Sequence, residues 1–177
     1  GHRRIAFVSG NTYESSCRSE RYAGYVQAMT EHRLTLSDDY IEHNLFPSQY
    51  RNTYYGDIET RNHALREAIK GMLDRFMNLP EPPSAISSSN DYIALNIMNV
   101  ARDMGIRIPE DLSLTGFDGL EICSYVNPRL TTVAQNFSLL GQTTVTLLDS
   151  LIRDPQRRVE EIRIDTKLVL GESVRRV

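Results

Sequence analysis

The sequence has no tryptophan, only two cysteines and no apolar run long enough to cross a membrane. Cys17 and Cys123 lie far apart, and so few cysteines do not indicate a disulfide framework. We therefore expect two reduced thiols in a cytoplasmic protein. No signal peptide is visible, so we expect no contact with a membrane.

An excess of positive charge is also missing. Twenty Lys and Arg residues face 23 Asp and Glu residues, which leaves a formal net charge of −3. Without a global positive field, the chain on its own is not expected to bind DNA or RNA.

The sequence also lacks the common motifs of cofactor chemistry. Gly10 stands alone after the first apolar segment, so there is neither a dinucleotide-binding nor a phosphate-binding glycine loop. Among the four histidines, only His63 has a spaced partner, Glu67, and a solvated helix pair explains both. No Ser/His/Asp or Cys/His constellation is evident either. We expect no cofactor, no metal and no enzymatic activity.

What the chain does have is an alternation of short apolar segments with amphipathic ones. Buried strands are predicted at residues 4–9, 84–87, 112–116 and 130–134, a weaker strand at 39–46 and an edge strand at 161–170. Helices are predicted at residues 17–32, from Asp57 to Pro80, between the polar turn at 88–91 and Gly105, and at 138–152. This order predicts an α/β fold, a doubly wound parallel sheet with helices on both faces.

Three polar residues follow strands of that sheet. Arg21, Asn90 and Asp118 should meet at its carboxyl edge, where open parallel sheets bind ligands. A guanidinium, an amide and a carboxylate together suit a ligand with many hydroxyls or a purine-like edge.

Each of the three residues also has a plain structural explanation. Asn90 could only cap its helix, and Asp118 could only be a turn residue before Gly119. Arg21 could simply pair with Glu14 or Glu20 on the surface.

Five segments resemble, in order, the effector domain of the LacI/GalR family of bacterial transcriptional repressors. They are GHRRIAF (1–7), RYAGY (21–25), SNDYIA (89–94), IPEDLSLTGFD (108–118) and PRLTTVAQ (128–135), the last completed by Leu140-Gly141. The resemblance implies the periplasmic-binding-protein-like fold, mainly its second subdomain. It implies residues 1–134 as that subdomain, 135–160 as a crossover helix returning to a missing first subdomain, and 161–177 as a tail strand. The helix-turn-helix headpiece of the family is absent.

The resemblance also implies a function. Arg21, Asn90 and Asp118 occupy positions at which the family contacts its effector, and Gln135 lies at the crossing between the subdomains. Phe46, Tyr54 and Tyr55 are the candidates for an aromatic residue that stacks on the ligand. The expected effector is a small, sugar-like molecule that controls operator DNA binding through the missing headpiece.

Two expectations concern assembly and the alternative function. We expect a homodimer, with the apolar face of Ile93, Ile97 and Met98 as one contact, unless those residues only face the local sheet. The alternative function is a periplasmic sugar-binding protein of a transport system. A helix-turn-helix upstream of Gly1 would indicate the repressor, and a signal peptide would indicate transport.

Overall fold

The computed structural model describes residues 1–10, 16–45, 58–158 and 161–177. The strands are β1 (Ile5–Val8), β2 (Ile41–Glu42), β3 (Ala85–Ser88), β4 (Ser113–Asp118), β5 (Thr131–Ala134) and β6 (Lys167–Val169). The α-helices are α1 (Ser16–Glu31), α2 (Ile58–Met77), α3 (Asp91–Asp103) and α4 (Phe137–Arg153). Two short 3-10 helices lie at Asp38–Tyr40 (η1) and Glu121–Ser124 (η4).

The strands form one sheet in the order β2-β1-β3-β4-β5-β6. All neighbouring pairs from β2 to β5 are parallel, and only β6 runs antiparallel to its neighbour. The chain moves from β1 to β2 through α1, from β2 to β3 through α2 and from β3 to β4 through α3, whereas the crossover from β4 to β5 carries only the short η4. The predicted α/β class is confirmed.

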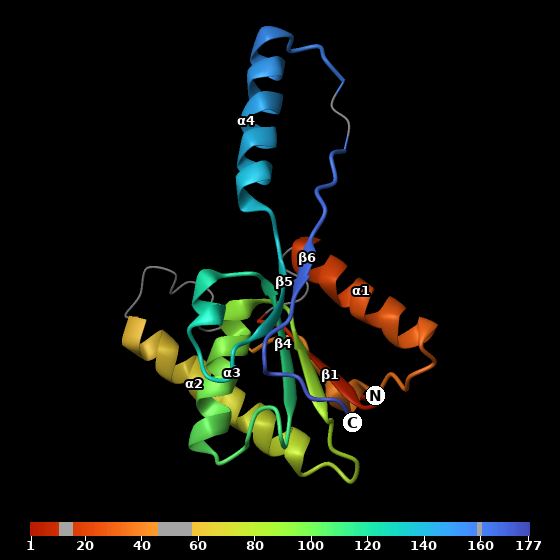
Figure 1. Ribbon diagram of the computed structural model, residues 1–177, viewed down its shortest axis with the longest axis vertical. Helices are drawn as coiled ribbons and strands as arrows, with labels where there is room; N and C mark the ends of the chain where they lie inside the picture. The colour runs from red at the N-terminus through yellow and green to blue at the C-terminus, as the bar shows by residue number, and fades with distance from the viewer. Residues whose placement is uncertain (11–15, 46–57, 159–160) are drawn as a thin grey trace.

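Helices cover both faces of the sheet, as expected (Figure 1). On one face, α1 packs Tyr25 and Met29 against Phe7 of β1. On the other, α2 and α3 bury the larger core, because their apolar residues recur at helical spacing. The fully buried large side chains of α2 and α3 are Leu65, Ile69, Leu73, Phe76, Ile93 and Ile97.

Helix α3 starts and ends at the residues that its sequence signals indicate. Asn90 is the N-cap, and its side chain accepts a hydrogen bond from the backbone N–H of Ile93. Gly105 follows the helix with a φ of 75°, the left-handed conformation that glycine adopts without strain.

The apolar stripe of α3 belongs to the local core. Ile93 and Ile97 are 1% and 0% exposed, and Met98 is 9% exposed. Ile93 and Ile97 therefore face the local core, where the sheet and α2 cover them, and cannot contact a second copy, whereas Met98 also lines a surface groove.

Two predicted strands differ from the structure. The weak strand at 39–46 is reduced to Ile41–Glu42, because Ser37 caps a 3-10 turn at Asp38–Tyr40 immediately before it. The tail strand at 161–170 is reduced to Lys167–Val169 and runs antiparallel. The antiparallel direction of β6 follows from the position of α4. The chain leaves the sheet at the carboxyl end of β5, forms α4 and re-enters beside β5 from the same end.

Helix α4 projects from the sheet and packs against no other helix (Figure 1). None of its residues is buried. Its exposed large apolar side chains are those of Phe137, Leu139, Leu140, Val145, Leu148 and Ile152. Across the described ranges, no helix is both long and apolar enough to cross a membrane.

The segment after β6 is tied to the amino-terminal ends of the central strands. Ser173 is fully buried; its Oγ donates to the carbonyl of Leu114 at 2.6 Å and accepts from the backbone N–H of Thr131 at 2.8 Å. His2 completes this region, with its ring nitrogens 2.8 Å from the Ser84 hydroxyl and 3.0 Å from the Arg175 carbonyl.

We expect Ser173→Ala to lower the free energy of unfolding by about 1–3 kcal/mol, because it leaves a buried N–H without its acceptor. Urea denaturation of the wild-type and variant proteins measures this difference. An unchanged midpoint would show that the Ser173 hydroxyl does not stabilise the sheet.

Candidate functional site

A hollow of about 560 Å³ at the carboxyl edge of the sheet is lined by two of the predicted site residues, Arg21 and Gln135, whereas Asn90 and Asp118 lie beside it and not in its lining. Its wall comes from α1, from the strands β1, β3, β4, β5 and β6, and from Gln135, which follows β5. The lining residues are Phe7, Cys17, Glu20, Arg21, Gly24, Ser87, Ser88, Thr115, Gly116, Phe117, Thr132, Val133, Gln135 and Leu168.

Arg21 reaches from α1 across the ends of two strands. Its Nη1 donates to the carbonyl oxygen of Ser89 at 2.6 Å, and its Nη2 donates to Oδ1 of Asp118 at 3.0 Å. The guanidinium carbon also lies 4.0 Å from the centre of the Phe117 ring. Arg21 therefore forms an ion pair with Asp118, from another element, and Glu14, one of the two surface partners considered for it, lies outside the described residues.

Asp118 ends β4 in a conformation that few residues adopt. Its φ is 123°, and Gly119 follows with a φ of 75°. At Gly119 a side chain would collide with Ala134 of β5, so the turn lies directly against the neighbouring strand. A non-glycine residue in this region costs free energy and persists only where its surroundings hold it in place.

The environment of Asp118 also disfavours its charged form. Burial raises the pKa of this carboxyl above its ordinary value, and the nearby Asp91 adds to the rise. Arg21 and the hydrogen bond from Gln135 pull the pKa of Asp118 back down without cancelling the effect of burial. The side chains of Arg21 and Asp118 remain 19% and 22% exposed, so both are partly open to solvent.

Gln135 joins the same network one residue after β5. Its Nε2 donates to Oδ1 of Asp118 at 2.8 Å, and its backbone N–H donates to the Asp118 carbonyl at 3.1 Å. The structure thus brings Arg21, Asp118 and Gln135 together at one carboxylate oxygen.

Asn90 lies next to this network, because Arg21 bonds the carbonyl of the preceding residue, Ser89. Its side-chain oxygen is used as the helix cap. No residue that the structure describes accepts a hydrogen bond from the Asn90 Nδ2. Capping therefore uses only the side-chain oxygen of Asn90 and not its NH₂ group, the donor half of the amide. The cap explanation accounts for the oxygen only.

Sequence reasoning missed two contributors, Phe117 and Asp91. Phe117 precedes Asp118, and its ring supports the Arg21 guanidinium. Asp91 looks like an ordinary first residue of a helix, but it is fully buried and bonded to two other elements. The aromatic candidates Phe46, Tyr54 and Tyr55 lie outside the described residues.

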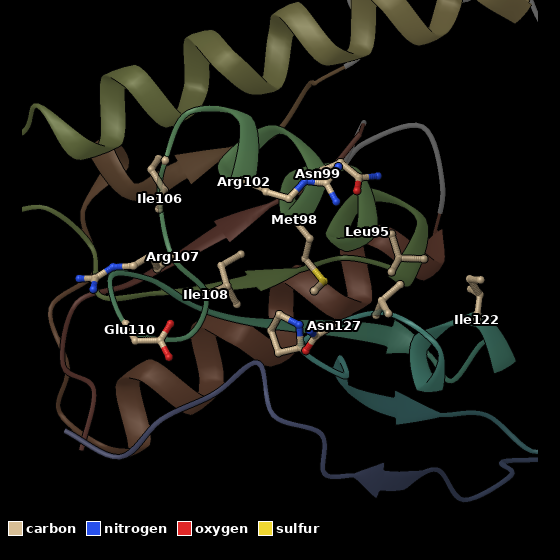
Figure 2. Close-up of a pocket in the computed structure, with 13 residues that line it drawn as sticks. Leu95, Met98, Asn99, Arg102, Ile106, Arg107, Ile108, Glu110, Ile122 and Asn127 are labelled. Carbon is tan, nitrogen blue, oxygen red and sulfur yellow. The ribbon is translucent and has the colours of Figure 1, made fainter.

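A larger hollow, of about 690 Å³, lies elsewhere, between α3 and the segment that carries Asn127 (Figure 2). Its lining is mainly aliphatic, with Leu95, Met98, Ile108 and Ile122 around it. Polar groups from several strand ends do not converge there, whereas they do at the carboxyl edge. We therefore assign the candidate ligand site to the smaller hollow.

No group of three or more His, Cys, Asp or Glu side chains able to hold a metal ion occurs in the described part of the chain. The site instead offers a fixed guanidinium, a carboxylate with a second oxygen, Oδ2, and the donor half of an amide. Such a set binds vicinal hydroxyls or a ring edge that both donates and accepts.

We expect Asp118→Asn to leave the free energy of unfolding at pH 7 unchanged or raised. Because the folded-state pKa of this carboxyl is raised, its ionisation disfavours the folded state at neutral pH. The difference between variant and wild type should fade below about pH 3.9, the ordinary pKa of an aspartate, since the wild-type carboxyl is then neutral in both states. Urea titrations at several pH values test this. A loss above about 1 kcal/mol at pH 7 would mean that the pair with Arg21 holds the fold together.

Comparison with known proteins agrees with this architecture. The profile of the periplasmic binding protein-like domain matches residues 1–174. Over 178 residues the chain is 32% identical to the probable HTH-type transcriptional repressor ExuR of Bacillus subtilis, covering 100% of this chain and 47% of ExuR. Over 175 residues it is 27% identical to the HTH-type transcriptional repressor PurR of Photobacterium profundum, covering 99% and 47%.

Solved structures give the same result. The transcriptional regulator CelR in complex with cellobiose superposes with a TM-score of 0.78 at 25% identity, over 98% of this chain and 47% of CelR. A regulatory protein of the LacI family from Chloroflexus aggregans superposes with a TM-score of 0.76 at 26% identity, over 98% and 56%.

The chain spans about half the length of the curated relatives it matches. Those relatives are transcriptional repressors, which favours the regulator over the transport protein. The relatives and solved structures that the chain resembles are transcriptional regulators, including a LacI-family member, and the profile shows that the chain belongs to the periplasmic binding protein-like domain family.

Proposed function

We propose that this chain is the effector-binding part of a cytoplasmic transcriptional repressor and that it has no catalytic role. The observation that carries the proposal is the network of Arg21, Asp118 and Gln135 at the carboxyl edge of the sheet. The network is organised before any ligand arrives, and it is open enough for a ligand to reach it.

The proposed effector is a small, hydroxyl-rich, sugar-like molecule. Oδ2 of Asp118 accepts from one or two hydroxyls, and the donor half of the Asn90 amide reaches a third group on the same ligand. The ring of Phe117 adds an apolar surface beside these polar groups. CelR, a structural neighbour, was solved with cellobiose, which supports a sugar here. A ligand with a purine-like edge is the alternative that the same donors and acceptors allow.

The domain organisation proposed from the sequence also explains the exposed helix. Residues 1–134 form one subdomain, 135–160 cross to a first subdomain, and 161–177 return. In support, α4 has no buried residue and carries six large apolar side chains in water, an arrangement that needs a covering partner. The relatives are about twice as long as this chain, so the missing half has room for that subdomain and for a DNA-binding headpiece.

The mechanism then follows from the position of the site. The hollow lies at the edge of the sheet from which α4 projects, so a ligand in it would face the first subdomain. A ligand that contacts both subdomains favours one relative orientation by its differential affinity for the two states. A changed orientation alters the placement of paired headpieces on operator DNA.

Pairing of headpieces requires a dimer, and we propose that the groove beside α3 binds a second copy of this chain. It is lined by Leu95, Met98 and Val126, and Ile122 is 50% exposed beside them (Figure 2). Both signs of charge also occur along the groove, on Arg102, Arg107 and Glu110. A surface with apolar residues and both charges can pair with its own copy across a twofold axis.

The effector site is tested by a thermal-shift panel of cellobiose, D-glucose, D-galacturonate and hypoxanthine on the whole natural protein. For the compound that raises Tm most, Asp118→Ala should weaken binding by about 2–4 kcal/mol in calorimetry, because hydroxyl partners of a charged acceptor are left unpaired. Arg21→Lys should lose nearly as much, since an ammonium cannot reproduce the planar fork.

The matched control is Glu172→Ala, which removes a carboxylate also paired with an arginine, Arg129, outside the lining of the hollow and of the groove. It should bind the compound normally. All three variants should retain affinity for an operator selected from random DNA without effector. Normal effector binding by Asp118→Ala would show that the site is elsewhere.

The dimer is tested by sedimentation of the whole protein at micromolar concentration. We expect a dimer for the wild type and at least roughly tenfold weaker association for Ile122→Arg, which places a charge in the groove. Gln27→Arg, on the exposed face of α1, should stay dimeric. A wild-type monomer would contradict the proposal.

A further inference from the structure

Asp91 is a fully buried carboxylate that belongs neither to the apolar core nor to the proposed ligand contacts. It is the first residue of α3 and directly follows Asn90. Within the described ranges no ion pair includes it, and its partners are neutral donors. Burying a carboxylate without a cation costs several kcal/mol unless hydrogen bonds and a helix N-terminus stabilise it.

The two oxygens of Asp91 connect α3 to the residues around the site. Oδ2 accepts from the backbone N–H of Leu120 at 2.8 Å, two residues after Asp118. Oδ1 accepts from the hydroxyl of Thr132 at 2.5 Å, three residues before Gln135. The buried thiol of Cys123 bonds to the same carboxylate; burial and this hydrogen bond raise the pKa of Cys123 to about 12.

The Asp91 carboxylate fills a space between β4 and β5. Gly116 of β4 lies against the carboxylate, and a side chain at that position would collide with Oδ1 of Asp91 and with Leu130. The carboxylate therefore occupies a gap that a glycine on one strand and a threonine on the next provide.

We propose that Asp91 is a positioning residue of the effector site, whose carboxylate sets the spacing of Asn90, Asp118 and Gln135. The inference rests on the proposed function of that site. Asn90 directly precedes Asp91, Asp118 lies two positions before Leu120, and Gln135 lies three positions after Thr132, so the three residues lie at the ends of α3, β4 and β5.

The strained turn at Asp118 explains why such a residue is needed. With a φ of 123°, Asp118 keeps its conformation only if the chain is held on both sides. The backbone N–H of Gln135 bonds the Asp118 carbonyl on one side, and Asp91 bonds the N–H of Leu120 on the other. Without Asp91, the turn loses one of these two supports.

The test compares two variants of the whole natural protein without any ligand. Asp91→Asn removes the charge, and Thr132→Val removes one donor while Asp91 stays charged and the strand residue stays β-branched. In hydrogen–deuterium exchange, peptides covering 117–123 should exchange roughly tenfold faster in both variants, as expected for one lost buried hydrogen bond. Peptides covering 62–76 of α2 should be unchanged.

A second measurement reads the site itself. In a carbon-13 NMR titration, with Asp118→Asn as the assignment standard, the pKa of Asp118 should fall toward the ordinary aspartate value in Thr132→Val. Burial is the main reason that this pKa is raised, and a released turn admits water. Ser173→Ala is the matched control, because Ser173 is equally buried and also bonds two strands. It should leave both readouts at 117–123 unchanged.

An unchanged 117–123 region and an unchanged Asp118 pKa in Thr132→Val would overturn the inference, as would the same changes in Ser173→Ala. If Asp91→Asn does not fold, Thr132→Val alone decides. The two tests are independent, because the exchange and NMR measurements use no ligand. A negative effector panel would refute the proposed function but not the positioning role of Asp91. The exchange and NMR results would refute the positioning role whether or not a sugar binds.

Discussion

Five neighbouring strands run in one direction, and the rest of the molecule depends on that shared direction. It carries the ends of β1, β3, β4 and β5 to a single edge, so residues far apart in the sequence meet there. Arg21 and Asp118 are 97 positions apart and form an ion pair at this edge. A fold with alternating strand directions would have divided the same residues between two edges.

The edge carries free-energy costs that the core does not. Asp118 combines a left-handed backbone with a charge that burial disfavours. These costs are offset by the apolar core on the α2 and α3 face, where large side chains are fully buried. The molecule therefore separates the part that stabilises it from the part that is organised to meet a ligand, as is common for binding sites.

The strands and helices with strong local signals could be predicted from the sequence. The buried strands lie within one or two residues of the predicted ranges, because each apolar run ends at a turn, and α3 was bounded by Asn90 and Gly105. The antiparallel direction of β6 could not be predicted, because it depends on where the chain re-enters the sheet after α4. Arg21 and Asp118 were located by the rule of strand ends, but Asp91 was not. Its burial depends on Gly116 and Thr132, which lie on strands that approach only in the folded molecule.

The pairing of β5 with β6 limits how α4 can move. Thr132, Val133 and Ala134 pair with β4 on one side and with Val169, Leu168 and Lys167 of β6 on the other, so β5 is held in the sheet up to its last residue. Only Gln135 and Asn136 lie between this strand and α4. A displacement of α4 relative to the sheet is therefore taken up at these two residues, and Gln135 bonds Asp118 through both its side chain and its backbone.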